Sequence, residues 1–151
     1  MKIKDITVRP PVTAPAETTI QRAARLMAGE AVGSLIIADG DQLLGIVTDR
    51  DLVVRAVARG LPLDTRVDDI MTMNVIALDV DTDVRDAIRA FGNHAVRRLP
   101  IVQDGKLVGL LSLDDLIVAL AGQFGEVTQG LTAQLLFPHA FDEPSHPAHV
   151  E

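Results

Sequence analysis

The sequence predicts a mixed α and β fold made of two copies of one unit, each ordered strand, helix, strand, strand, helix. The first observation is an internal repeat: residues 5–57 align with residues 69–121 at an offset of 64 positions without a gap, and 14 of the 53 aligned pairs are identical. The second is a helical apolar period followed by two short apolar runs in each copy. The third is a shared motif that closes each copy. A register that holds ungapped over this length indicates a duplication.

The elements of each copy follow from local signals. Thr18-Thr19 and Thr82-Asp83 are typical helix N-caps, and apolar residues at helical spacing follow both. In the first copy we predict a strand at 12–13, a helix from residue 20, strands at 35–38 and 43–47, and a helix at 49–59. In the second copy we predict a strand at 75–78, a helix from residue 84, strands at 99–102 and 107–111, and a helix at 113–121. Asp-Gly turns between the paired runs predict hairpins.

The predicted domains are residues 1–62 for the first repeat, ending in a linker, and 63–122 for the second. One copy of this size is only marginally stable alone, because small units bury a low fraction of their surface. We therefore expect the two copies to pack sheet to sheet with pseudo-two-fold symmetry. Residues 123–151 are predicted to form a further amphipathic helix over 124–137 and a flexible tail from Pro138.

Composition excludes several classes of function. The chain has 151 residues, a net charge of −7, 3% aromatic residues and no Trp or Tyr, which argues against a nucleic-acid partner. It has no cysteine, so disulfides, Cys-ligated zinc and a Cys nucleophile are absent. Neither a signal peptide nor an apolar run of about 20 residues is evident, so no membrane partner and a cytoplasmic location are expected.

The repeated motif that carries chemistry is Gly-x-x-(Ser/Thr)-x-x-Asp. It runs from Gly45 through Thr48 to Asp51, and again from Gly109 through Ser112 to Asp115. The hydroxyl and the acid three residues later form a capping box at the start of a helix. The same arrangement suits a nucleotide, because a helix N-terminus and a hydroxyl attract phosphate and a nearby carboxylate accepts ribose hydroxyls. We expect the two glycines to leave room for a ligand at the backbone.

These segments resemble the tandem cystathionine β-synthase (CBS) domain pair, or Bateman module, of the stand-alone bacterial type. The resemblance covers about residues 1–122 and rests on three stretches: Asp-Ile-Met-Thr at 69–72, Val-Arg-Arg-Leu-Pro-Ile at 96–101 and Gly-Ile-Val-Thr-Asp-Arg-Asp-Leu at 45–52. It implies a regulatory module that binds AMP, ADP, ATP, S-adenosylmethionine or NAD between the repeats, with no required cofactor. It also implies a homodimer of modules and a regulated partner protein.

Two ligand sites follow by position from this resemblance. The favoured site comprises Thr48, Arg50, Asp51, Arg97, Arg98, Val8 and Thr13. The second and weaker site comprises Ser112, Asp115, Asn74, Ile76 and Ala77. The ranking rests on charge, because Arg50 stands beside Asp51 whereas Asp114 beside Asp115 would repel a phosphate. The arginines at 97 and 98 correspond to Gly33 and Ser34 in the first repeat.

Two alternatives remain open on the sequence alone. The first is a structural interaction module whose clefts stay empty, and the second is a metal-dependent hydrolase that uses the motif aspartates. The chain lacks a nucleophile paired with a base, so no catalytic residue and no enzyme activity are predicted. Residues 79–83 begin like a calcium loop, but Val84 and Ala90 replace its glycine and glutamate, and no metal site is predicted.

Overall fold

The computed structural model describes residues 1–136 and divides into two compact units, residues 1–116 and 117–151. The first unit contains both sheets and the helices of the repeats, except that it holds only residues 113–116 of the last helix. In the second, the described residues, 117–136, are helical. Residues 137–151, which include the predicted flexible tail, lie outside the described residues. No helix within the described part of the chain is long and apolar enough to cross a membrane.

The predicted order of elements is confirmed. The first repeat contains β1 (Thr13–Ala14), α1 (Ile20–Glu30), β2 (Ser34–Asp39), β3 (Gln42–Thr48), α2 (Asp49–Asp51) and the π-helical turn η2 (Leu52–Val57). The second contains β4 (Leu78–Asp79), α3 (Val84–His94), β5 (Arg98–Gln103), β6 (Lys106–Ser112) and α4 (Leu113–Leu136). A short 3₁₀ helix precedes the first strand of each repeat: η1 (Ile3–Asp5) and η3 (Val67–Asp69).

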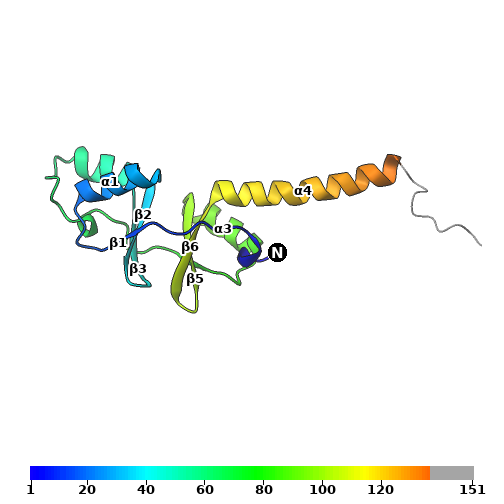
Figure 1. Cartoon of the computed structure of the whole chain (residues 1–151), viewed down its shortest axis with the longest axis horizontal. Helices are drawn as coiled ribbons and strands as arrows, with labels where there is room; N and C mark the ends of the chain where they lie inside the picture. The colour runs from blue at the N-terminus through cyan, green and yellow to red at the C-terminus, as the bar shows by residue number, and fades with distance from the viewer. Residues whose placement is uncertain (137–151) are drawn as a thin grey trace, which may run out of the picture. The chain divides into compact units, whose positions relative to one another are not determined.

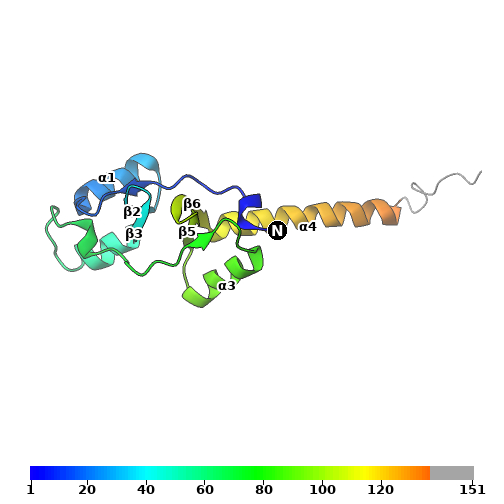
Figure 2. The same cartoon turned by 90° about the horizontal axis from the view of Figure 1, so that it is seen from below.

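Each repeat forms one three-stranded sheet, ordered β1-β2-β3 and β4-β5-β6. The first strand of each sheet runs parallel to the second, and the second and third form an antiparallel hairpin. Figures 1 and 2 show the two hairpins side by side, with β3 next to β6. The α+β class and the pairing of two sheets are therefore as predicted.

The closing helices differ from the prediction. Where the sequence predicts one helix ending at residue 121 and another over 124–137, α4 is continuous from Leu113 to Leu136. Gly122 and Gly125 lie inside it, since a glycine lowers helix stability by only about 1 kcal/mol and no proline interrupts the segment. In the first repeat the helix continues from α2 into a π turn, in which the Ala58 amide donates to the Val53 carbonyl at 2.8 Å.

The opening segment of the second repeat belongs to the core of the first. The Ile20 amide at the start of α1 donates to the Thr65 carbonyl at 2.9 Å, and the Val67 amide donates to the Thr18 carbonyl at 2.7 Å. Val67 and Ile70 are fully or almost fully buried in the cluster formed by α1, β2 and β3. The first repeat is therefore completed by residues that follow it in the chain.

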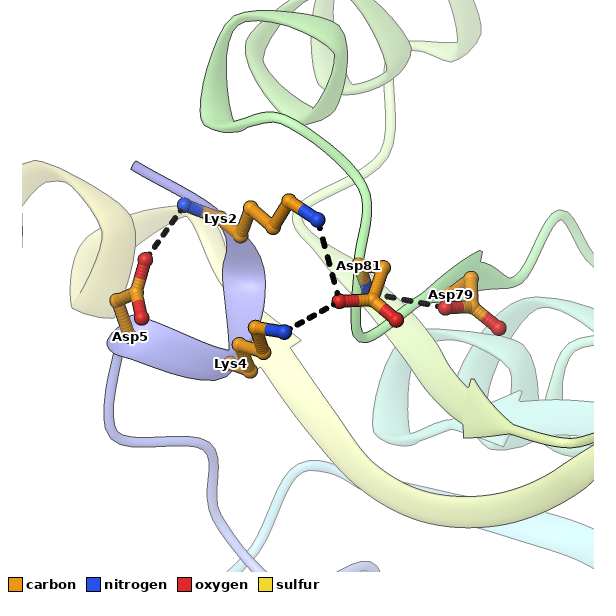
Figure 3. A network of polar contacts seen from close by, with 5 residues as sticks. All are labelled: Lys2, Lys4, Asp5, Asp79 and Asp81. Atoms are coloured by element: carbon orange, nitrogen blue, oxygen red, sulfur yellow. Dashed lines mark hydrogen bonds and ion pairs between the residues drawn. The ribbon is translucent and has the colours of Figure 1, made fainter.

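The N-terminal segment makes the equivalent exchange with the second repeat. The Ile3 amide donates to the Thr82 carbonyl at 3.0 Å, next to the start of α3. The ammonium groups of Lys2 and Lys4 lie 3.3 and 2.6 Å from Oδ1 of Asp81, as Figure 3 shows. The hydrogen bond from Lys4, followed by that from Lys2, lowers the pKa of Asp81. Backbone bonds and an ion pair thus hold residues 1–5 against the second repeat.

Gly45 and Gly109 mark the points where each opening segment crosses the other repeat. The amides of Ile46 and Thr72 donate to each other's carbonyl oxygens at 3.0 and 2.9 Å, and the Leu110 amide donates to the Arg9 carbonyl at 3.0 Å. A Cβ added at Gly45 would lie 2.8 Å from the Thr72 carbonyl oxygen, and one at Gly109 would overlap the Val8 side chain. The expectation that these glycines make room for a ligand is wrong, because the space holds the crossing chain.

We predict that Gly45→Ala destabilises the protein by about 1–3 kcal/mol, because the added methyl forces the backbone of Thr72 away from β3. The loss should be read from urea unfolding, and hydrogen exchange should quicken at the Ile46 and Thr72 amides. Gly29→Ala is the matched control: nothing lies within 4 Å of a Cβ there, so stability should stay equal or rise by up to about 1 kcal/mol. Equal stability of the two variants would contradict the prediction.

Candidate functional site

Thr48 and Asp51 cap the helix that follows β3. Oγ1 of Thr48 accepts from the Asp51 amide at 3.1 Å, and Oδ2 of Asp51 accepts from the Thr48 amide at 2.9 Å. This reciprocal pair is the capping box predicted from the sequence. The second oxygen of Asp51, Oδ1, lies 3.7 Å from Nε of Arg55 one turn further along. Arg55 also donates to the Ile70 carbonyl at 3.0 Å, so it links the helix to the crossing segment.

Ser112 and Asp115 occupy the equivalent position before α4, but their contacts differ. Oγ of Ser112 accepts from the Asp115 amide at 3.0 Å and donates to Asp115 Oδ2 at 2.6 Å. Oδ1 of Asp115 is 3.2 Å from Nη2 of Arg9, which comes from the crossing N-terminal segment. The hydrogen bond from Ser112, followed by the interaction with Arg9, lowers the pKa of Asp115. The carboxyl is thus ionised at neutral pH, and its side chain remains 21% exposed.

A cavity of about 210 Å³ opens beside this second pair, which we call the Ser112 cleft. Its walls come from both repeats: the N-terminal segment, the end of α1 with the start of β2, the start of β5, and the end of β6 with the start of α4. The lining residues that carry charge or a hydroxyl are Arg9, Ser34, Arg98, Ser112, Asp114 and Asp115. The cleft therefore combines two cations with the hydroxyl and carboxylate of the motif.

A second cavity of about 240 Å³, which we call the Ile46 cleft, is related to the first by the repeat. Ile46 corresponds to Leu110, Asn74 to Pro10 and Val96 to Val32, at the common offset of 64 positions. Its lining is mostly apolar and includes Ile46, Val75, Ile76, Val96 and Leu99, together with Thr72, Asn74, His94 and Arg98. Ile46 lies on β3 two residues before Thr48. Neither Thr48 nor Asp51 lines this cavity itself.

In the structure, the opening segment that the sequence assigned to each site lies at the other site. Val8 was grouped with Thr48, but it lies against Gly109, on the strand that leads to Ser112. Asn74 and Ile76 were grouped with Ser112, but they line the Ile46 cleft. The physical reason is the crossing of each opening segment onto the other repeat. Thr13 pairs with Ile36 in the sheet, and both it and Ala77 lie outside the two linings.

The predicted arginines take three different positions. Nη2 of Arg97 is 3.3 Å from Oδ1 of Asp114, beside the second motif rather than the first. Arg98 lines both clefts. Arg50 is exposed and lines neither. The charge ranking of the sites places Arg97 and Arg98 at the Thr48 site, with at most one of them entering the cleft, whereas Arg97 forms an ion pair with Asp114 next to Ser112.

Sequence reasoning missed Arg9 and Arg55, the two arginines that face the motif carboxylates. Arg9 corresponds to Met73 and Arg55 to Ala119, so neither is repeated and the internal comparison could not single them out. The i,i+4 spacing from Asp51 to Arg55 is a signal that could have identified the ion pair between these two residues. Within the described residues, no group of three or more histidine, aspartate or glutamate side chains is placed to hold a metal ion.

We predict that Ser112→Ala raises the pKa of Asp115 towards its ordinary value, because the hydrogen bond to the ionised form is lost. Because the pKa of Asp115 is lower in the folded protein, the ionised carboxylate stabilises the fold at pH values above the pKa of the unfolded chain. This stability is lost as the pH falls through the folded pKa. The variant should therefore be less stable at neutral pH, both because this contribution shrinks and because the missing cap costs about 0.5–2 kcal/mol, and it should lose less stability than the wild type as the pH falls. Ser112→Thr keeps the hydroxyl and is the control. Carboxyl NMR titration measures the pKa, and an unchanged value in Ser112→Ala contradicts the assignment.

Comparison with known proteins agrees with the duplicated fold. The family model described as the CBS domain matches the chain twice, at residues 3–57 and 67–122. CBS domain-containing protein YhcV of Bacillus subtilis is 34% identical over 116 residues, which cover 77% of this chain and 83% of the relative.

Two solved structures with bound ligands are similar over most of their length. CBS domain protein PAE2072 from Pyrobaculum aerophilum, complexed with AMP, is 28% identical with a TM-score of 0.71 and covers 81% of this chain and 99% of its own. The CBS domain pair of protein MJ0100, in complex with 5′-methylthioadenosine and S-adenosyl-L-methionine, is 28% identical with a TM-score of 0.72 and covers 82% and 98%. With both repeats matched and the fold shared, the chain belongs to the CBS domain family.

Proposed function

We propose that the chain is a regulatory module that binds an adenosine-containing ligand in the two clefts between its repeats. The observation that carries this proposal is the pair of cavities related by the repeat: the Ser112 cleft is lined by the hydroxyl and carboxylate of its motif, and the Ile46 cleft lies against the strand that leads to Thr48. Relatives of the same fold hold AMP, 5′-methylthioadenosine or S-adenosyl-L-methionine. A regulatory rather than catalytic role suits a Ser112 hydroxyl that caps the helix and an Asp115 whose lowered pKa makes it a weak base.

The carboxylates are proposed to accept the ribose hydroxyls. Asp115 is ionised and partly exposed, so its oxygens can accept two hydroxyl hydrogens of a sugar. Arg9 already lies 3.2 Å from this carboxylate and must move or share it. An ion pair whose arginine is largely exposed contributes only about 0–1 kcal/mol, so a bound ribose can replace it at small cost.

The remaining parts of the ligand match the rest of the linings. Val12 and Val32 of the Ser112 cleft, and Ile76 and Val96 of the Ile46 cleft, offer apolar surface for an adenine ring. Guanidinium groups bind phosphate strongly through charge-assisted hydrogen bonds, and Arg98 is available to both clefts. AMP, ADP, ATP, S-adenosylmethionine and NAD share the adenosine part that these walls would hold.

We also propose that a second copy of the chain and a regulated protein complete the system. Val53, Val54 and Val57 on η2 are 59%, 49% and 71% exposed, an apolar helix surface that a homodimer would cover. Ligand binding between repeats that share their opening segments would change how these segments cross. A partner protein would read that change as a shift between two states.

Titration of AMP, ATP, S-adenosylmethionine and NAD by calorimetry tests the proposal. We expect at least one ligand to bind below the millimolar range, and we expect Asp51→Ala and Asp115→Ala each to weaken one class of site roughly 10-fold or more, because hydrogen bonds to a charged acceptor are lost. Asp64→Ala, an exposed residue outside both linings, is the matched control and should bind normally.

Thermal unfolding of each variant separates loss of binding from loss of the helix cap. If no ligand binds, or if both aspartate variants bind as the wild type does, the proposal is overturned and the structural interaction module is favoured. ADP release during incubation with ATP and magnesium would instead favour the hydrolase.

A further inference from the structure

Arg98 is placed where the two clefts meet. It is the first residue of β5, where it pairs with Ser112, and it lines both the Ser112 cleft and the Ile46 cleft. Its counterpart in the first repeat is Ser34, which pairs with Thr48, is 4% exposed and lines only the Ser112 cleft. The Ser112 cleft also holds Arg9, which is paired with Asp115, whereas the lining of the Ile46 cleft contains no other arginine or lysine. Arg98 is therefore the cation that the two linings share.

The surroundings of Arg98 leave its guanidinium uncommitted. The salt bridges formed within residues 1–136 use other lysines and arginines, and none includes Arg98. Nη2 lies 3.5 Å from the point where a Cβ on Gly33 would stand, and Oδ2 of Asp49 lies 3.1 Å from the same point, so the absence of a side chain at Gly33 leaves room for both groups. Position 97, the counterpart of Gly33, carries an arginine that is paired with Asp114.

We propose that Arg98 is a phosphate-binding residue shared by both clefts, so that phosphorylated adenosine ligands compete for it and fill the clefts with negative coupling. This inference rests on the proposed function. A guanidinium that gives two of its five N–H groups to a phosphate in one cleft has fewer donors left for a phosphate in the other. Two phosphates that share this guanidinium would each gain less from its charge than one phosphate alone, and their like charges would repel each other. Ligands without phosphate do not use Arg98, and they fill the two clefts independently.

The coupling is reciprocal, because each ligand changes the affinity of the other by the same factor. A charge-assisted contact that only the first ligand obtains corresponds to a separation of roughly 10-fold to 100-fold between the two dissociation constants. The chain would thus hold one AMP firmly over a wide range of concentration, and a second only in excess.

NMR titration of the full chain with AMP and with adenosine tests the inference, because the amides of Ile46 and Leu110 report on one cleft each. In the wild type we expect the chemical-shift changes of the two amides to saturate at AMP concentrations that differ by roughly 10-fold or more. For adenosine the two concentrations should differ less. Arg98→Ser, which installs the residue of the first repeat, should weaken AMP binding and reduce its separation to that of adenosine. Adenosine binding should fall much less than AMP binding in this variant.

Lys106→Ser removes the same charge from a strand position that lines neither cleft, and it should behave as the wild type. If Arg98→Ser binds AMP at both amides as the wild type does, or if AMP and adenosine show the same separation in the wild type, the inference is overturned while the proposed function stands. If neither ligand shifts either amide, the proposed function fails and this inference fails with it.

Discussion

The reciprocal crossing of the two opening segments is the constraint on which the rest of the first unit depends. Thr72 forms a two-bond bridge with Ile46, and Arg9 bonds to Leu110, each beside a glycine that has no room for a side chain. Just before each crossing, a 3₁₀ helix buries apolar residues of one repeat in the core of the other, as Val67 and Ile3 show. Neither repeat has a complete core or a complete cleft without the other, which agrees with the marginal stability expected of so small a unit.

The sequence predicted the elements well because their signals are local. Thr19 and Asp83 cap the helices that they were expected to cap, and the apolar runs at 35–38 and 99–102 lie inside β2 and β5. The exchange could not be predicted in the same way. A repeat aligned with itself shows that Val8 and Thr72 are equivalent, but it does not show which copy each one contacts. Gly45 and Gly109 carried the signal of a close approach, and only the folded structure shows that the approaching group is the opening segment of the other repeat.

The candidate site illustrates how duplicated halves diverge. Each motif carboxylate faces an arginine, but Asp51 has Arg55 from its own helix, and Asp115 has Arg9 from the crossing segment. These arginines do not correspond by the offset of 64, so each half acquired its counter-charge separately. The linings differ as well, since the Ser112 cleft contains two cations and the Ile46 cleft is mostly apolar. The comparison of charges along the sequence ranked the two sites by the residues adjacent to each motif aspartate in the chain. In the structure, the crossing of the opening segments determines which charged side chains lie close together.

Because the two clefts share part of their walls, the proposed coupling between them would follow from the fold itself. A ligand in the Ser112 cleft would contact residues before β1 and at the start of β5, and a ligand in the Ile46 cleft would contact residues before β4 and the same start of β5. The segment before β1 is continuous with η1, and the segment before β4 is continuous with η3. The opening segment that lines each cleft is therefore also the segment that completes the core of the other repeat. A ligand that displaces Arg9 from Asp115 therefore acts on the N-terminal segment, whose η1 is anchored on the second repeat through Asp81. Because the displaced contact is a weak, largely exposed ion pair and the anchor combines backbone bonds with buried Ile3, the segment can adjust near Arg9 without leaving the fold.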